Sequence, residues 1–204
     1  MVKQTYLFYF LLSPVFFSCG DDDGDDEPVN TLTFKGTTYT FEKGFVFDEG
    51  STGDDGGDDT HYRYYFQIGE KELEVITDEE DGDKYADCNQ CVNAYFQLLS
   101  PGISGFKPGT FEFVDTDNLS LSNVSGKYLF EYADIEFIMP GDDDGTYFEA
   151  ISGTVTVKEN SNLNYTLTCS MVVQETNDGS NFIDGTKQTV SFSFTGDFTY
   201  IDNR

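Results

Sequence analysis

The feature that most constrains the fold of this chain is a period-two alternation of apolar and polar side chains. It is clearest near the C-terminus, where one face of the chain carries Val190, Phe192, Phe194, Phe198 and Tyr200 together with Gly196. The intervening positions are Ser, Thr or Asp. Because successive side chains of a β-strand point to opposite faces of a sheet, this run predicts a half-buried antiparallel strand, bent at Gly196.

The same alternation recurs along the chain, at residues 32–34, 39–41, 62–68, 73–76, 92–98, 111–114, 128–139, 147–157 and 165–173. No stretch has a 3.6-residue period with the capping residues of a helix. Polar connections at residues 35–38 and 69–71 predict tight hairpins. The sequence therefore predicts an all-β fold, an antiparallel β-sandwich, with an up-and-down, lipocalin-like β-barrel as the alternative.

The charge balance excludes several classes of partner. The chain has 204 residues, with 11 Lys+Arg against 38 Asp+Glu and a formal net charge of −27. Nucleic acids and anionic headgroups are bound by clustered cations, so we expect no nucleic-acid partner. Aromatic residues make up 16% of the chain, which supports a buried core and argues against global disorder. A single His and no recognisable nucleophile motif indicate that the protein is not an enzyme.

The first 18 residues have the pattern of a secretion signal peptide. Lys3 supplies the positive charge, residues 6–12 form the apolar segment, and Ser18 is the small residue before Cys19. The apolar segment is shorter than the roughly 20 residues that a membrane-spanning helix needs. We therefore expect residues 1–18 to be the signal peptide, 19–30 to form an acidic tether, and 31–204 to fold as a single all-β domain.

Residues 16–19, Phe-Phe-Ser-Cys, resemble a bacterial lipobox, with Phe16 where Leu is usual. The following Gly-Asp-Asp-Asp, residues 20–23, is similar to the acidic export signal of surface-exposed lipoproteins of the Bacteroidota. This resemblance implies that Cys19 is lipidated as the first residue of the mature protein. It also implies an outer-membrane location, with the domain anchored by lipid and facing the cell exterior.

A second resemblance covers most of the domain. It is carried by strand-and-turn segments at residues 93–100, 108–111, 152–157, 165–167 and 194–200. They are similar to a pattern in uncharacterised Bacteroidota lipoproteins. The resemblance implies a shared fold and no catalytic residues, because the family has no assigned activity.

The motif Cys88-Asn89-Gln90-Cys91 fits a structural disulfide, a redox pair or half of a metal site in an exported chain. It follows an acidic loop instead of opening a helix, which disfavours a reactive thiol. A zinc site would also need His61 and Cys169, and Cys169 shares a strand face with apolar residues, as a core side chain does. We expect a Cys88–Cys91 disulfide, with another pairing, free thiols, metal binding or redox activity as alternatives.

Acidic loops at residues 54–59 and 142–145 suggest calcium, which binds oxygen ligands. The candidate ligands are Asp142, Asp143 and Asp144. Neither loop matches the EF-hand pattern, and a solvated acidic surface explains the same residues. We therefore expect no metal or other cofactor, and calcium stays as the alternative.

Carboxylates for glycoside hydrolysis would have to pair across a cleft. Glu131 shares strand parity with Ala133 and Ile135, so strict alternation would turn it inward, while Asp134 and Glu136 occupy the opposite face. A β-bulge at this place would reset the parity and expose Glu131. We favour the bulge over a catalytic carboxylate.

Residues 61–67 are rich in aromatic side chains, which could form an exposed platform for sugar rings. Ordinary alternation predicts instead that Tyr62, Tyr64 and Phe66 pack in the core. It then leaves an ordinary exposed strand face made of His61, Arg63, Tyr65 and Gln67.

These features indicate a lipid-anchored cell-surface protein that acts as a non-catalytic binding or accessory module. Its expected partners are the membrane, through the lipid anchor, and a glycan, a peptide or an outer-membrane protein. One alternative is an adhesion or structural component ordered by calcium. Another is a small-ligand carrier, if the strands close into a barrel around a cavity.

Overall fold

The computed structural model describes residues 30–53, 58–78, 82–115, 119–141, 145–177 and 181–204. Within these residues the chain forms strands and one short 3-10 helix, η1 (Leu121–Val124), and no α-helix. The all-β prediction is confirmed. The strands are β1 (Thr31–Phe34), β2 (Thr37–Thr40), β3 (Lys43–Ser51), β4 (His61–Gly69), β5 (Glu74–Thr77), β6 (Lys84–Asp87), β7 (Val92–Pro101), β8 (Gly109–Phe113), β9 (Leu129–Phe137), β10 (Thr146–Ser161), β11 (Asn164–Asn177), β12 (Asn181–Phe182), β13 (Gln188–Asp197) and β14 (Thr199–Asp202).

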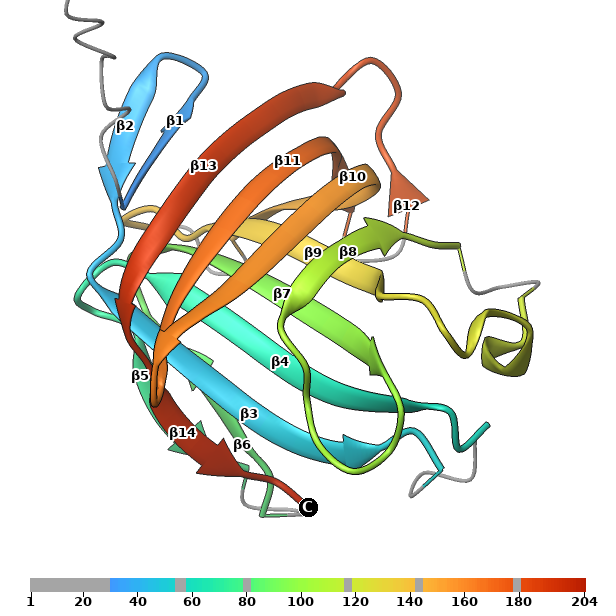
Figure 1. Ribbon diagram of the computed structural model, residues 1–204. Coiled ribbons are helices and arrows are strands. Elements are labelled where there is room, and N and C mark those ends of the chain that lie inside the picture. Colours follow the sequence, from blue (N-terminus) through green and yellow to red (C-terminus); the bar gives the residue numbers. More distant parts are fainter. Residues whose placement is uncertain (1–29, 54–57, 79–81, 116–118, 142–144, 178–180) are drawn as a thin grey trace, which may run out of the picture.

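One 12-stranded sheet contains all of these strands except β5 and β6, which pair with each other. Its order is β14-β3-β4-β7-β9-β8-β10-β11-β13-β1-β2, with β12 paired to β11. The sheet is mixed, because β14 runs parallel to β3 and β8 runs parallel to β9. It curls so that β3, β4 and β7 face β10, β11 and β13 across the core (Figure 1). The arrangement is thus a single curled sheet, where we expected two antiparallel sheets or an up-and-down barrel.

The last two strands belong to opposite halves of this sheet. β13 pairs with β11 and β1, whereas β14 pairs with β3. The chain passes from one to the other through Phe198, two residues after Gly196, where the sequence predicted a bend. Tyr200 lies opposite Val46 but remains 37% exposed, because β14 is at the edge of the sheet.

The main core fills the concave side of the sheet. Phe66, Phe96 and Phe111 are fully buried there, and Cys169 is a buried free thiol, as its strand parity predicted. Contacts cross between the two halves, as between Phe96 and Phe192, whose ring centroids lie 6.2 Å apart. Each such side chain contributes about 1.5–3 kcal/mol through burial, so the facing halves hold the sheet in its curl.

A second apolar cluster lies on the convex side, under the small β5–β6 sheet. Its members include Phe45, Phe47, Leu73 and the disulfide formed by Cys88 and Cys91. Phe45 and Phe47 point to this cluster, while Val46 belongs to the main core. β3 is therefore buried on both faces, which explains why its sequence lacks the alternation by which the other long strands were predicted.

Two expectations about β4 are wrong. Residues 69–71 are not a hairpin turn, because β4 pairs with β3 and β7 and the chain after Gly69 leaves the sheet. The outward face of β4 is also not simply exposed, since His61 and Gln67 are buried. The Gln67 amide donates to the carbonyl of Ala86 at 2.9 Å, because the β5–β6 sheet covers this side of β4. The hairpin predicted at residues 35–38 is confirmed as the β1–β2 connection.

Candidate binding site

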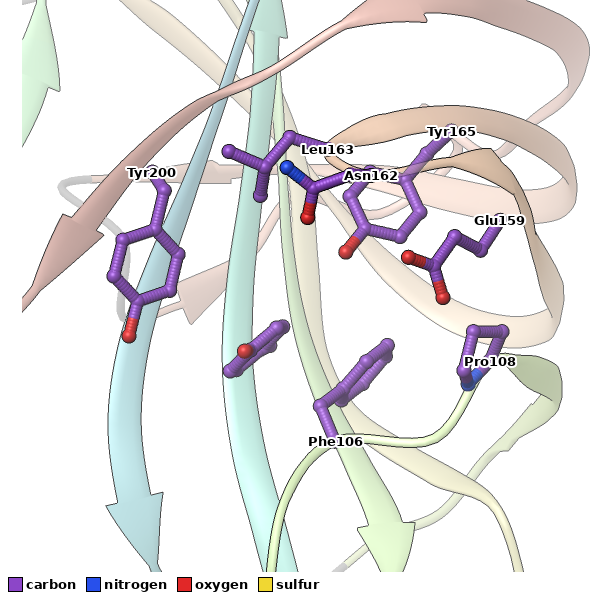
Figure 2. Close-up of a pocket in the computed structure, with 8 residues that line it drawn as sticks. Phe106, Pro108, Glu159, Asn162, Leu163, Tyr165 and Tyr200 are labelled. Carbon is purple, nitrogen blue, oxygen red and sulfur yellow. The ribbon is translucent and has the colours of Figure 1, made fainter.

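A pocket of about 430 Å³ opens at one end of the concave core (Figure 2). Four parts of the chain meet there: β4, the β7–β8 loop, the β10–β11 hairpin and β14. The pocket is lined by Tyr64, Phe106, Pro108, Glu159, Asn162, Leu163, Tyr165 and Tyr200.

The aromatic wall of the pocket is held by stacking. Phe106 stacks on Tyr64 with a centroid distance of 4.5 Å and on Phe111 with a centroid distance of 5.6 Å. The loop that carries it is fixed by its neighbour Lys107, whose backbone N–H donates to Ser100 and whose ammonium donates to the carbonyl of Pro101. Such aromatic pairs contribute about 0.5–1.5 kcal/mol beyond burial, so this wall is formed before a ligand arrives.

The β10–β11 hairpin forms another wall through a two-residue turn. Ser161 pairs with Asn164, and Asn162 and Leu163 connect them. Leu163 has φ 57°, a left-handed conformation that is uncommon for a bulky side chain. Its carbonyl accepts a 2.7 Å hydrogen bond from the N–H of Phe198, and its side chain packs against the main core. The fold therefore holds Leu163 in a strained conformation at the pocket, and such strain clusters at functional sites.

Polar groups from the same hairpin converge on the pocket. Figure 2 shows the hydroxyl of Tyr165, the amide of Asn162 and the carboxylate of Glu159 directed toward one space. Tyr165 is only 6% exposed and lies opposite Glu159 across the two strands. Within the part of the chain that the structure describes, none of these three groups has a hydrogen-bond partner. Their hydrogen-bonding capacity is available to a ligand, as is typical of small-molecule sites.

The electrostatic environment of the pocket is negative. Burial raises the pKa of Tyr165, and the charge of Glu159 raises it further. Burial, followed by a hydrogen bond to Asp48, raises the pKa of Tyr200 to about 12. That hydrogen bond runs from the Tyr200 hydroxyl to Oδ2 of Asp48 at 2.7 Å. The tyrosine hydroxyls are therefore neutral at physiological pH, and among the described residues that line the pocket none is Lys or Arg.

A second polar group lies on the convex face, centred on Asp134. Tyr132 donates a 2.7 Å hydrogen bond to this buried carboxylate, and Tyr95 and Glu149 lie directly opposite it on the neighbouring strands. Burial raises the pKa of Asp134 to about 7, and the charges of Glu136 and Glu149 act in the same direction. Asp134 can therefore exchange a proton near neutral pH.

The expected bulge at Glu131 is confirmed. Gln97 lies opposite Tyr132 and Leu98 opposite Phe130, so Glu131 is the extra residue. It is half-exposed and accepts a hydrogen bond from the Gln97 amide. Glu131 therefore does not point into the core.

The structure describes some of the other candidate site residues predicted from the sequence, and others lie outside its described residues. Cys88 and Cys91 are joined as expected, whereas Cys19 and the calcium candidates Asp142, Asp143 and Asp144 lie outside the described residues. Asp58 in the other acidic loop accepts hydrogen bonds from the Ser120 hydroxyl and the Ser122 N–H, so it tethers η1. Among the described residues, no group of three or more His, Cys, Asp or Glu side chains could hold a metal ion.

His61 is held by hydrogen bonds away from the pocket. Its Nε2 donates to the carbonyl of Lys127 at 3.1 Å, so its Nδ1 accepts from the Thr60 hydroxyl at 2.9 Å. Burial lowers the pKa of His61, which keeps the ring neutral at physiological pH. This histidine is a satisfied core side chain.

Sequence reasoning missed most of the pocket. Tyr64 and Tyr165 were expected only as core residues, and Phe106, Glu159, Asn162 and Leu163 were not singled out. The one available signal was Leu163, an apolar side chain inside the polar run 158–164 between two strands. Tight turns favour Gly, Pro, Asn, Asp and Ser, so a leucine at this place departs from the usual turn chemistry.

Comparison with protein-family models, with curated proteins and with solved structures finds no match to this chain. In the described part of the chain, no helix has the length and apolar character needed to span a membrane.

Proposed function

We propose that this protein is a lipid-anchored, cell-surface binding module that holds a small ligand in the pocket beside the β10–β11 hairpin. The observation that carries the proposal is the convergence of Glu159, Asn162 and Tyr165 on an aromatic wall, with no hydrogen-bond partner for their polar groups among the described residues. Tyr165 is 6% exposed, whereas Glu159 and Asn162 are exposed, so a ligand would replace water as the hydrogen-bond partner of these groups.

The pocket supports binding more than catalysis. Among its described lining residues, Glu159 is the one carboxylate, whereas glycoside hydrolysis uses two that flank the bond. Covalent catalysis needs a nucleophile beside a base, and no such pair lines this pocket in the described chain. The proposed module therefore captures its ligand without transforming it.

The proposed anchor is Cys19, through its resemblance to a lipobox. Each buried CH₂ of an acyl chain adds about 0.8 kcal/mol of membrane affinity, so acylation would hold the domain at the membrane. The acidic run 21–27 would repel anionic headgroups, which favours keeping the domain away from the membrane surface.

Membrane fractionation of cells that express wild type or Cys19→Ala tests the anchor. We expect the wild type in the membrane fraction and Cys19→Ala in the soluble fraction. Cys169→Ala is the matched control, because Cys169 is buried in the core and cannot carry the lipid. If Cys19→Ala stayed fully with the membranes, the anchor would be assigned wrongly.

Thermal melts of the full chain in a non-glycosidic detergent test the binding function. The ligand panel should cover neutral saccharides, organic amines, carboxylates and short peptides. A ligand at 100 times its dissociation constant adds about 2.7 kcal/mol to the free energy of unfolding, which raises the midpoint by several degrees. We expect at least one class to do so in the wild type and less in Tyr165→Phe, with Tyr85→Phe on the exposed side of β6 as the control. A panel without any stabilising ligand would contradict the proposal.

A further inference from the structure

We infer that the ligand of this pocket is a neutral carbohydrate. This inference rests on the proposed binding function and names the chemical class of the ligand. It is carried by the pattern of hydrogen-bond donors and acceptors around the pocket, by the apolar wall that faces them, and by the absence of Lys and Arg among the described lining residues.

The polar groups of the pocket offer both acceptors and donors to a ligand. The carboxylate of Glu159 only accepts, the amide of Asn162 does both, and so does the hydroxyl of Tyr165. A sugar hydroxyl also does both, and sugar rings carry several at close spacing. An ammonium ion cannot accept from Asn162 or Tyr165, and an apolar ligand would leave all three groups without partners.

The opposite wall suits the apolar side of a sugar ring. In Figure 2, Phe106 and Pro108 lie on one side of the pocket, and Asn162 and Tyr165 lie on the other. A pyranose ring has C–H groups on its faces and hydroxyls around its rim. Its face can therefore cover the apolar wall while its hydroxyls reach the hairpin, which matches the amphipathic shape of the site.

Charge selects against acidic ligands. Glu159 and the buried Asp48 lie on or beside the pocket, and the chain has a net charge of −27. The nearby guanidinium of Arg204 is paired with Asp202 at 2.9 Å. Phosphates and uronic acids would thus meet negative potential without a lysine or arginine from the described lining residues.

The pocket volume of about 430 Å³ fits one or two sugar rings. It lies within the range of about 300–1,000 Å³ for small-molecule sites. Because the pocket opens at the end of the β10–β11 hairpin, a longer chain of sugar units could continue into solvent. We therefore expect recognition of a terminal or short saccharide unit.

Saturation-transfer NMR with the full chain in a non-glycosidic detergent provides the test. The probes are neutral hexoses, pentoses, deoxyhexoses and N-acetylhexosamines, as monosaccharides and disaccharides, with glucuronate, glucosamine and choline as charged comparators. We expect at least one neutral saccharide to bind with a dissociation constant below about 10 mM. We expect glucuronate not to bind.

Two variants locate the bound sugar. Asn162→Ala and Tyr165→Phe should each weaken binding about fivefold or more, because each leaves a ligand hydroxyl without its partner. Their controls are Asn160→Ala and Tyr85→Phe; the Asn160 amide is already bonded to Asn164 and Thr166 on the same hairpin. Asn162 is exposed, so its replacement keeps the test valid even if Tyr165→Phe disturbs the core.

The outcomes separate this inference from the proposed function. If amines, carboxylates or peptides bind and no neutral saccharide does, the binding function stands and the carbohydrate assignment falls. If a neutral saccharide binds equally well to Asn162→Ala and Tyr165→Phe, it occupies another place and the assignment falls as well. If no class of ligand binds at all, both are wrong.

Discussion

At the scale of single residues, Leu163 and Asp134 both hold states that an isolated residue avoids. Leu163 has a left-handed backbone, and Asp134 is a carboxylate with an exposed fraction of 7%. In each case the neighbouring strands enforce the state, through the hydrogen bond from Phe198 to Leu163 and through the sheet neighbours of Asp134. Both states can be measured by substitution.

The strain at Leu163 predicts an inverted order of stability between two small replacements. A left-handed conformation costs an L-residue with a Cβ about 1–2 kcal/mol, and glycine avoids this cost. We therefore expect Leu163→Gly to be more stable than Leu163→Ala by about 1 kcal/mol in urea unfolding. The reverse order, which holds at ordinary strand positions, would show that the turn is not strained.

The raised pKa of Asp134 predicts a dependence of stability on pH. Because the folded state binds the proton more tightly than the unfolded state, this group stabilises the fold fully below pH 4, and the contribution is lost as pH rises through about 7. Tyr132, Glu136, Glu149 and Tyr95 face it, and the two glutamates oppose its ionisation.

Asp134→Asn should remove this contribution, because an amide does not ionise and its oxygen still accepts from Tyr132. We expect the free energy of unfolding of the variant, measured in urea, to exceed that of the wild type by about 1–3 kcal/mol at pH 8. We expect no such difference at pH 4. Glu74→Gln, on the exposed face of β5, is the control. Parallel pH profiles for wild type and Asp134→Asn would contradict the assignment.

The alternation of residues determined the core correctly but not the convex face. Phe66 and Cys169 lie where strand parity placed them, because both are buried on the concave side of the sheet. The predicted exposure of His61 and Gln67 was wrong, because a separate small sheet and the segment around Lys127 cover positions that parity assigns to solvent. Parity tells which residues share a face but not whether a distant segment covers that face.

At the scale of elements, the β10–β11 hairpin depends on a close approach of two backbones. Gly153 in β10 has φ 135°, and a Cβ there would lie 2.4 Å from the carbonyl oxygen of Ser170 and 2.6 Å from Cα of Met171. This approach accompanies the register shift between Ala150 and Ser152. The hairpin that presents the binding site therefore requires glycine at this position.

Gly153→Ala should consequently be destabilising by about 2 kcal/mol or more, because both the φ angle and the contact exclude a methyl group. Gly126→Ala is the matched control, since a Cβ at Gly126 meets nothing within 4 Å and its φ is not left-handed. We expect that variant to stay within about 0.5 kcal/mol of the wild type in chemical unfolding. Equal effects at the two positions would show that the close approach does not constrain the hairpin.

Strands with one buried face could be predicted from the sequence, because their side chains alternate between apolar and polar. Strands with both faces buried could not. β3 carries Phe45, Val46 and Phe47 in succession and gives no alternation, since both of its faces are covered. The pocket also could not be predicted from the sequence, because it forms where a turn, a loop and an edge strand meet. Those segments are far apart in the sequence and have no common periodic signal.

At the scale of the whole molecule, charge repulsion acts on the fold. A net charge of −27 destabilises a compact state, and dissolved cations screen it over a Debye length of about 10 Å at 0.1 M salt. Asp58, in the described part of one acidic loop, is already hydrogen-bonded to Ser120 and Ser122. For the acidic loops as a whole we keep the interpretation drawn from the sequence, a solvated surface.

This interpretation predicts equal effects of two divalent ions. Millimolar calcium and magnesium should raise the melting midpoint by the same few degrees over EDTA, through screening alone. A calcium-specific rise in differential scanning fluorimetry would instead establish a metal site and favour the calcium-ordered adhesion reading. The control is sodium chloride at matched ionic strength.

The pairing of β14 with β3 also sets the order in which the protein can be assembled. Tyr200 and Asp48, which it brings together, are 152 positions apart in the sequence. Until that late segment has emerged, one side of β3 has no strand partner, and contacts between such distant segments form slowly. In the described chain β14 follows every other strand, so this edge of the sheet is completed only after the other strands have been synthesised.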